Sequence, residues 1–334
     1  MKKRFLLYIC LFVSLLILTG CPSLFSLGQP NIDDKYEVAV INTENFICHN
    51  HLYKNKVLKS FKEKTLHNKT VFRSTLTVFY PEKKEKSPLV IIGHGWGDGK
   101  KSNMSLARYL AGQGYITVIF SAKHRDYPEQ FLIAFEEAYK IIQNASENPS
   151  SRLFKKIDLN KTSIIGHSMG GTAALHFAKG NKKIHTVIAL NPYNGASKTI
   201  ELVGGKNEIL GTDLSAMTIP LLIFTGEKDE IAFPEKTFEF CKNINQDIPF
   251  AFFSIKDGKH VHPMDKIGNT VSGSFNEQKH DIYRRIIVSW LDMFLKGDKN
   301  AAEQLYLNDE NFNKIKPLFK SKENLYPPYL LCNF

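Results

Sequence analysis

One stretch of sequence decides the fold: Thr162-Ser163-Ile164-Ile165-Gly166-His167-Ser168-Met169-Gly170-Gly171. Its first residues are typical of a short buried strand and those after Met169 of a helix, so Ser168 falls on the tight turn between them. Glycines two residues before and after the serine let strand and helix approach without a Cβ clash, which holds the hydroxyl out of the turn. The stretch therefore predicts a serine nucleophile that is held out of a tight turn at the carboxyl end of a strand.

Outward from this turn, short apolar runs alternate with amphipathic stretches. Several of the runs are apolar throughout, which fits strands of a parallel sheet that is covered on both faces. We therefore predict the α/β class, with a doubly wound, mostly parallel sheet. The predicted strands are residues 71–80, 89–93, 115–120, 162–166, 186–190, 221–226 and 250–255, with one more over 36–41; the predicted helices are residues 104–112, 129–145, 169–179, 234–243 and 279–296.

A serine hydroxyl needs a base and an orienting acid, and in hydrolases with such a turn both follow the serine in the chain. Asp229 comes just after the predicted strand 221–226, which makes it our candidate acid, with Glu227 and Glu230 as competitors. The base is expected in the loop after strand 250–255. We assign it to His260, and His262 is the alternative base.

The turn His94-Gly95-Trp96-Gly97 follows another apolar strand and predicts an oxyanion hole. Backbone N–H groups there can stabilise the negative charge that develops on a substrate carbonyl oxygen. The expected donors are the amides of Trp96 and Met169. His260 and His262 are not accompanied by further ligands at zinc-like spacing, so we predict no metal and no cofactor.

These motifs resemble the α/β-hydrolase superfamily, and within it the bacterial cutinases and polyester hydrolases and the related dienelactone-hydrolase-like enzymes. Asn191-Pro192-Tyr193 is similar to the Pro-aromatic pair beside their active sites, and residues 289–298 are similar to their final helix. The resemblance covers about residues 70 to 300 and implies that His94 and Tyr193 bind substrate, with Trp96 lining an aromatic acyl cleft. Two histidines in the base loop, where those cutinases have one, depart from the pattern.

The resemblance implies a serine carboxylic-ester hydrolase that acts through a Ser-His-Asp triad and an acyl-enzyme. Its partners would be small-molecule or lipid esters. A phospholipid acyl-hydrolase like the platelet-activating-factor acetylhydrolases is the alternative enzyme, and a surface lipoprotein that binds without catalysis is the alternative of another class. Nothing in the sequence resembles a nucleic-acid-binding module, and the sequence leaves the oligomeric state open.

The amino terminus predicts export. Three basic residues precede the uncharged run 5–18, which is short for a membrane span and fits a signal peptide. Leu18-Thr19-Gly20-Cys21 resembles a bacterial lipobox, which implies cleavage before Cys21, lipidation of its sulfur and attachment to a membrane outside the cytoplasm. Without residues 2–4 the formal net charge falls from +11 to +8, and we interpret the scattered lysines mostly as solvated surface.

The predicted organisation is a signal peptide over 1–20, a tether and N-terminal extension over 21–69, a hydrolase domain over 70–300 and a tail over 301–334. Residues 193–218 are a candidate for a small cap. The remaining cysteines are Cys48, Cys241 and Cys332. They permit one disulfide or none, and the sequence does not choose a pair.

Overall fold

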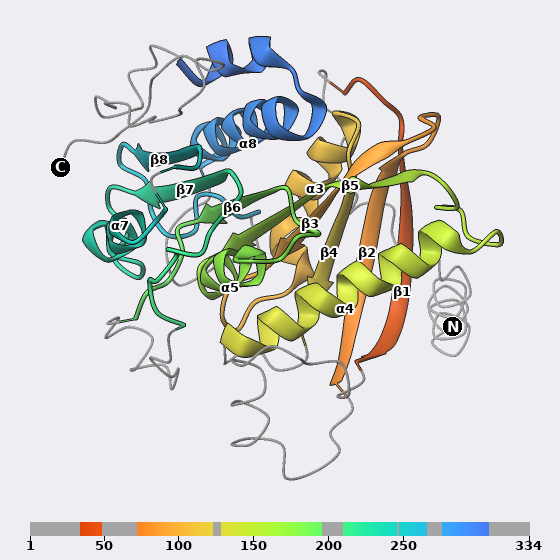
Figure 1. The fold of residues 1–334 in the computed structure, drawn as a ribbon, viewed down its shortest axis with the longest axis horizontal. Helices are drawn as coiled ribbons and strands as arrows, with labels where there is room; N and C mark the ends of the chain where they lie inside the picture. Colours follow the sequence, from red (N-terminus) through yellow and green to blue (C-terminus); the bar gives the residue numbers. More distant parts are fainter. Residues whose placement is uncertain are drawn as a thin grey trace, which may run out of the picture. The chain divides into compact units, whose positions relative to one another are not determined.

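One sheet of eight strands organises the part of the chain that the computed structural model describes, namely residues 34–48, 72–122, 128–195, 210–245, 247–265 and 276–306 (Figure 1). The strand order is β1-β2-β4-β3-β5-β6-β7-β8. β1 and β2 run antiparallel at one edge, and all strands from β4 to β8 in that order pair in parallel. The strands are β1 (Val38–Cys48), β2 (Phe72–Pro81), β3 (Ser87–Gly93), β4 (Ile116–Ser121), β5 (Ile157–His167), β6 (Thr186–Leu190), β7 (Leu221–Gly226) and β8 (Phe250–Ile255).

Helices cover both faces of this sheet, as the fully apolar strands predict (Figure 1). On one face, α4, α5 and α7 share a single apolar cluster with side chains of the sheet. On the other face, Tyr283 of α8 packs its ring 4.9 Å from that of Phe224 in β7, and Trp290 of α8 donates to Thr186 of β6 at 2.8 Å. The helices are α3 (Met104–Gly112), α4 (Pro128–Glu147), α5 (Met169–Ala178), α7 (Pro234–Lys242) and α8 (Glu277–Leu291), with shorter helical turns at Lys100–Asn103, Asp292–Lys296 and Lys299–Tyr306. The predicted doubly wound α/β fold is confirmed.

Three details differ from the predicted organisation. β1 ends at Cys48, whereas the predicted strand ends at residue 41, and it joins the edge of the sheet through nine residue pairs with β2. The last long helix ends as an α-helix at Leu291 and continues as a π-helical turn over Asp292–Lys296. The final helical turn, Lys299–Tyr306, crosses the predicted boundary at residue 300.

The parallel register brings the carboxyl ends of the central strands to one edge. Gly93 of β3 pairs with Gly166 of β5, and His167 of β5 pairs with Leu190 of β6. Gly226 of β7 pairs with Ile255 of β8. The loops that follow these strands carry the predicted site residues, so the register alone places them along the same edge.

Some predictions concern residues outside the described ranges. These are the signal peptide, Cys21 and most of the possible cap over 193–218, together with Cys332 and the side chain of Cys48. Cys241 is buried in α7. Of the described helices, none combines the length and the apolar character that crossing a membrane requires.

Candidate active site

Ser168 lies on the bend between the end of β5 and the start of α5. Its backbone has φ 55° and ψ −122°, a conformation that non-glycine residues rarely adopt. The bend is held by the Ser168 N–H, which donates to Leu190 O at 2.9 Å, and by the Ser168 carbonyl, which accepts from the amides of Gly171 and Thr172. The sequence prediction of a sharp strand-to-helix turn at this serine is confirmed.

Two glycines make the bend sterically possible. A Cβ on Gly166 would lie 2.1 Å from the carbonyl oxygen of Gly170, and a Cβ on Gly170 would lie 2.2 Å from the carbonyl oxygen of His94. Both obstacles are backbone atoms, so neither can rotate out of the way. The glycine spacing therefore lets β5, α5 and the loop after β3 meet closely around the serine.

Side chains from three loops form one hydrogen-bonded chain at this edge. Ser168 Oγ lies 2.8 Å from His260 Nε2, and His260 Nδ1 lies 2.8 Å from Asp229 Oδ2. All three side chains belong to residues that are less than a tenth exposed. Since a carboxylate accepts hydrogen bonds, the proton of the imidazole belongs on Nδ1, and the lone pair of Nε2 faces the serine hydroxyl. This arrangement can remove a proton from Ser168.

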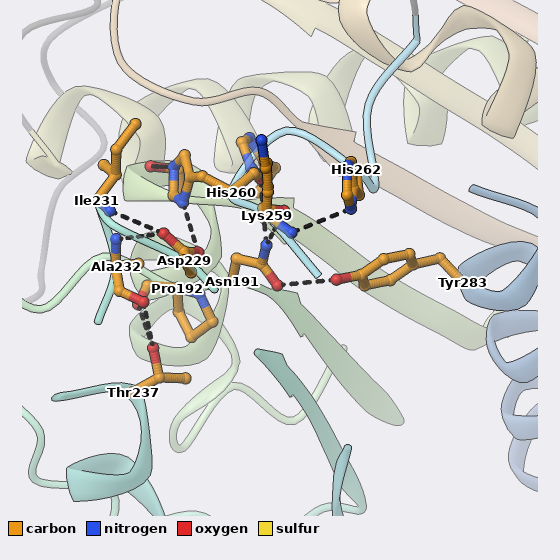
Figure 2. A network of polar contacts seen from close by, with 12 residues as sticks. Asn191, Pro192, Asp229, Ile231, Ala232, Thr237, Lys259, His260, His262 and Tyr283 are labelled. Carbon is orange, nitrogen blue, oxygen red and sulfur yellow. Dashed lines mark hydrogen bonds and ion pairs between the residues drawn. The ribbon is translucent and has the colours of Figure 1, made fainter. Parts of the chain in front are cut away.

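Asp229 is held by its own turn. Its Oδ1 accepts from the amides of Ile231 at 2.9 Å and Ala232 at 2.8 Å, which leaves Oδ2 for His260 (Figure 2). The competing candidates from the sequence, Glu227 and Glu230, are both exposed. Of the three carboxylates, the structure therefore brings Asp229 to the imidazole.

His262 occupies a different position in the same loop. Its Nδ1 accepts from the Lys259 N–H at 3.0 Å (Figure 2), and burial lowers the pKa of the ring. The contact to Ser168 is made by His260. The structure thus gives the two loop histidines different partners: His260 contacts the serine, whereas His262 closes the turn that carries it.

The predicted oxyanion donors belong to two segments that border the serine. Met169 is the first residue of α5, and the first amides of a helix have no carbonyl acceptor within the helix. The positive end of the helix dipole adds to the attraction for a negatively charged oxygen there. A Cβ on Gly95, the neighbour of Trp96, would lie 3.1 Å from Ser168 Cβ, so the loop after β3 runs directly against the serine.

A family model described as PET hydrolase-like matches residues 59–323 of this chain, which is most of its length. The chain belongs to the PET hydrolase-like family. Among curated proteins, Cutinase 1 of Thermobifida cellulosilytica is 24% identical over 232 residues, which cover 69% of this chain and 76% of the relative. A cutinase of Thermobifida fusca strain YX is also 24% identical, over 69% of this chain and 66% of its own. Cutinase est1 of Thermobifida alba is 22% identical over 69% of this chain and 68% of its own.

Membership in the PET hydrolase-like family makes this chain an ester-hydrolysing serine hydrolase with the α/β-hydrolase fold. The sheet order and the helices on both faces agree with that assignment. The resemblance inferred from the sequence is therefore confirmed at the level of fold and reaction class.

Two residues that the resemblance assigns to substrate binding have buried side chains in this PET hydrolase-like chain. His94 is fully buried, packs edge-on against Phe120 and Phe131, and accepts from the Ala122 N–H through Nε2 at 3.1 Å. Its ring is thus not brought to an accessible surface beside Ser168, because the apolar core and the Ala122 amide hold it inside.

Tyr193 is likewise only 1% exposed and belongs to the apolar cluster under α4, α5 and α7. Its backbone is bound on both sides: its N–H donates to Ser168 O at 3.0 Å and its carbonyl accepts from Thr172 Oγ1 at 2.5 Å. Trp96 is half-buried and packs on the same cluster. Of the three predicted contact residues, Trp96 is the one whose side chain keeps an accessible surface.

Sequence reasoning missed the residues that support the loop of His260. His167 Nε2 donates to His260 O at 2.8 Å, and burial lowers the pKa of this ring, so it is neutral. Asn191 and Tyr283 form a second support (Figure 2). One sequence feature could have pointed to Asn191: it comes directly after a predicted strand, at the same sheet edge as Ser168.

Metal ligation finds no support in the described ranges. Within them, no group of three or more His, Cys, Asp or Glu side chains could hold an ion. His260 and His262 are each engaged by protein atoms through Nδ1.

Proposed function

We propose that this chain hydrolyses carboxylic esters by covalent catalysis on Ser168, with His260 as the base and Asp229 as the orienting acid. One observation carries the proposal: the continuous hydrogen-bonded chain from Ser168 Oγ through His260 to Asp229, with 2.8 Å at both steps. The serine sits on a positive-φ bend at the carboxyl edge of the sheet, where its hydroxyl can meet a substrate carbonyl.

In the proposed reaction, Ser168 Oγ attacks the carbonyl carbon while its proton passes to His260 Nε2. The amides of Met169 and Trp96 donate to the oxygen as it becomes negative. His260 then returns the proton to the leaving alcohol, and an acyl-enzyme remains on Ser168. A water molecule then gives a proton to His260 and attacks the acyl carbon. The bond from the acyl carbon to Ser168 Oγ breaks, His260 returns the proton to Ser168 Oγ, and the carboxylic acid is released.

The proposed substrates are esters with short or medium acyl groups. They include polymers whose units are joined by ester bonds. The family description, PET hydrolase-like, and the name of the relatives, cutinase, both refer to enzymes that act on ester polymers. The half-buried side chain of Trp96, in the proposed oxyanion loop, offers an apolar aromatic surface for the acyl group of the substrate. A chain-length series of p-nitrophenyl esters, run beside phospholipids with a short acyl chain, separates this substrate class from the phospholipid alternative.

The test of the catalytic roles is turnover of p-nitrophenyl butyrate by the mature domain and by three variants. Ser168→Ala and His260→Ala are each expected to lose at least about a thousandfold in kcat, since members of a triad act as a unit. His262→Ala is expected to lose at most about tenfold, because it removes one neutral hydrogen bond to Lys259. Equal rates for wild type and Ser168→Ala would reject the proposal. A larger loss of kcat in His262→Ala than in His260→Ala would identify His262 as the base.

We further propose that the chain is exported as a lipoprotein, with residues 1–20 removed and Cys21 lipidated. The hydrolase domain would then follow a tether on the membrane surface, and a small cap over 193–218 and a tail over 301–334 would flank its core. Palmitate labelling and membrane fractionation test this in the native host, where Cys21→Ser is expected to abolish labelling and release the protein. Labelling that persists in Cys21→Ser would contradict it.

A further inference from the structure

Asn191 is a fully buried polar residue at the carboxyl end of β6, outside the three side chains of the proposed reaction. Its backbone adopts φ 46°, the left-handed region that asparagine tolerates better than most residues. Its N–H donates to Phe224 O at 3.0 Å, which ties it to the neighbouring β7. The side chain therefore projects from a fixed point on the sheet.

The side-chain amide of Asn191 binds the loop that carries His260. Its Nδ2 lies 3.2 Å from Lys259 O and 3.1 Å from His260 O (Figure 2). A carbonyl oxygen can only accept, so the NH₂ group must face this loop and Oδ1 must face away. The two carbonyls are those of His260 itself and of the residue before it, so the contact acts on the backbone of the base.

Tyr283 fixes the orientation of that amide from the far side. Its hydroxyl donates to Asn191 Oδ1 at 3.2 Å (Figure 2). Tyr283 belongs to α8, and its ring packs against Phe224 of β7. Burial raises the pKa of Tyr283, so the hydroxyl keeps its proton and remains a donor. A chain of hydrogen bonds thus runs from the Tyr283 hydroxyl of α8 through the Asn191 amide to the backbone carbonyls of the His260 loop.

A second donor reaches the same carbonyl from the end of β5. Neutral His167 donates through Nε2 to His260 O at 2.8 Å, and the two imidazole rings lie 4.7 Å apart between centroids. The backbone of His260 is therefore held by side chains from two neighbouring strands of the sheet. Both strands end at the edge where Ser168 lies.

We propose that Asn191, oriented by Tyr283, is a positioning residue that fixes the backbone of His260 so that Nε2 meets Ser168 Oγ. The inference rests on the proposed function, because positioning has a catalytic effect only if His260 is the base. Misplacing a catalytic group by about 1 Å can cost roughly a hundredfold in rate. The same contacts also contribute to folding, so the test must separate position from stability.

The test compares Asn191→Gly and Tyr283→Phe with a matched control. Glycine adopts φ 46° without strain, so Asn191→Gly removes the amide and leaves the backbone acceptable. The control is Asn194→Gly, which deletes the same side chain three residues later, where Nδ2 bonds Lys236 O and Glu239 Oε2 instead of the loop. Tyr283→Phe removes only the hydroxyl and guards against a failure of Asn191→Gly to fold.

The expected results, measured with p-nitrophenyl butyrate well below each melting temperature, are specific to kcat. Asn191→Gly is expected to lose roughly 10- to 100-fold in kcat with KM within about twofold, and Tyr283→Phe about 3- to 10-fold. Asn194→Gly is expected to stay within about twofold. Proton NMR supplies an independent signature: the low-field resonance of the His260 Nδ1–H bonded to Asp229 should broaden or shift in the first two variants and persist in the control.

Unchanged kcat and an unchanged low-field resonance in folded Asn191→Gly and Tyr283→Phe would overturn the positioning role. Equal losses in Asn194→Gly would also overturn it, because a general loss of stability would then explain them. Ser168→Ala, assayed in parallel, separates the two claims. If Ser168→Ala keeps wild-type activity, the proposed function fails; if it is inactive while the Asn191 and Tyr283 variants are normal, only the positioning role fails.

Discussion

Individual residues in this site have hydrogen-bonding roles that other residue types cannot fill. Asp229 is the clearest case, because both of its oxygens act as acceptors: Oδ1 for the amides of Ile231 and Ala232, and Oδ2 for His260 Nδ1. An asparagine at this position has one oxygen, which could accept from the two turn amides, and its NH₂ group would then face the imidazole as a donor. The imidazole would then carry its proton on Nε2, facing Ser168.

Asp229→Asn is therefore expected to keep the fold and lose activity. By analogy with other serine hydrolases, the wrong tautomer should reduce kcat by about 10⁴-fold. The measurement is steady-state hydrolysis of p-nitrophenyl butyrate together with the melting temperature. Glu230→Gln, at the exposed neighbouring carboxylate, is the control and should keep wild-type rates. An active Asp229→Asn enzyme would contradict the assigned role.

Elements are where the sequence was most informative. The central strands were predictable because buried parallel strands are continuous apolar runs, such as Leu221–Gly226, and their carboxyl ends mark the site. Other features depend on contacts distant in the sequence. The position of Asn191 directly after a predicted strand places it at the same sheet edge as Ser168, but its partner is a loop 68 residues later in the chain, which no local pattern identifies. The burial of His94 and Tyr193 was missed for the same reason: the helices that cover them come from elsewhere in the chain.

Another distant contact joins the base loop to α3. Asp265, five residues after His260, accepts the Ser105 N–H through Oδ2 at 2.7 Å, and the Ser105 hydroxyl bonds its other oxygen. Its own N–H donates to Ser102 O at 2.8 Å. The N-cap residue of α3, Asn103, makes no side-chain cap bond, so Asp265 caps this helix from another segment.

Asp265→Ala is expected to lower the free energy of unfolding by about 1–2 kcal/mol, the usual effect of losing a helix cap. Urea denaturation followed by circular dichroism measures it. Asp247→Ala, at an exposed aspartate before β8, is the matched control and should leave the midpoint unchanged. Identical midpoints for the two variants would show that Asp265 does not stabilise α3.

On the scale of the whole molecule, buried histidines link stability to pH. Burial lowers the pKa of His167, His176 and His262, and lowers that of His280 to about 3. In the unfolded chain a histidine has a pKa of about 6.5. Below that pH the unfolded chain therefore binds more protons than the folded chain, so the free energy of unfolding decreases as the pH falls. Asp265 acts in the opposite sense between about pH 4 and its raised pKa of about 6, but it is a single group against five histidines, because burial also lowers the pKa of His185.

The melting temperature is therefore expected to be level above pH 7 and to fall steadily from about pH 6.5 towards pH 4.5. Each buried histidine contributes up to about 1.4 kcal/mol per pH unit in that window. Scanning calorimetry across this range measures the profile, and His280→Gln should make its acid side less steep. A flat profile, or the same slope in His280→Gln, would refute this origin of acid sensitivity.

The central claim is that the hydroxyl of Ser168, activated by His260, forms a covalent bond to the substrate. The most direct measurement is mass spectrometry after reaction with diethyl p-nitrophenyl phosphate, which phosphorylates an activated serine as it releases p-nitrophenol. We predict one diethylphosphoryl group per chain, on the peptide that contains Ser168, and almost none in His260→Ala. A modified residue elsewhere, or equal labelling of His260→Ala, would contradict the account.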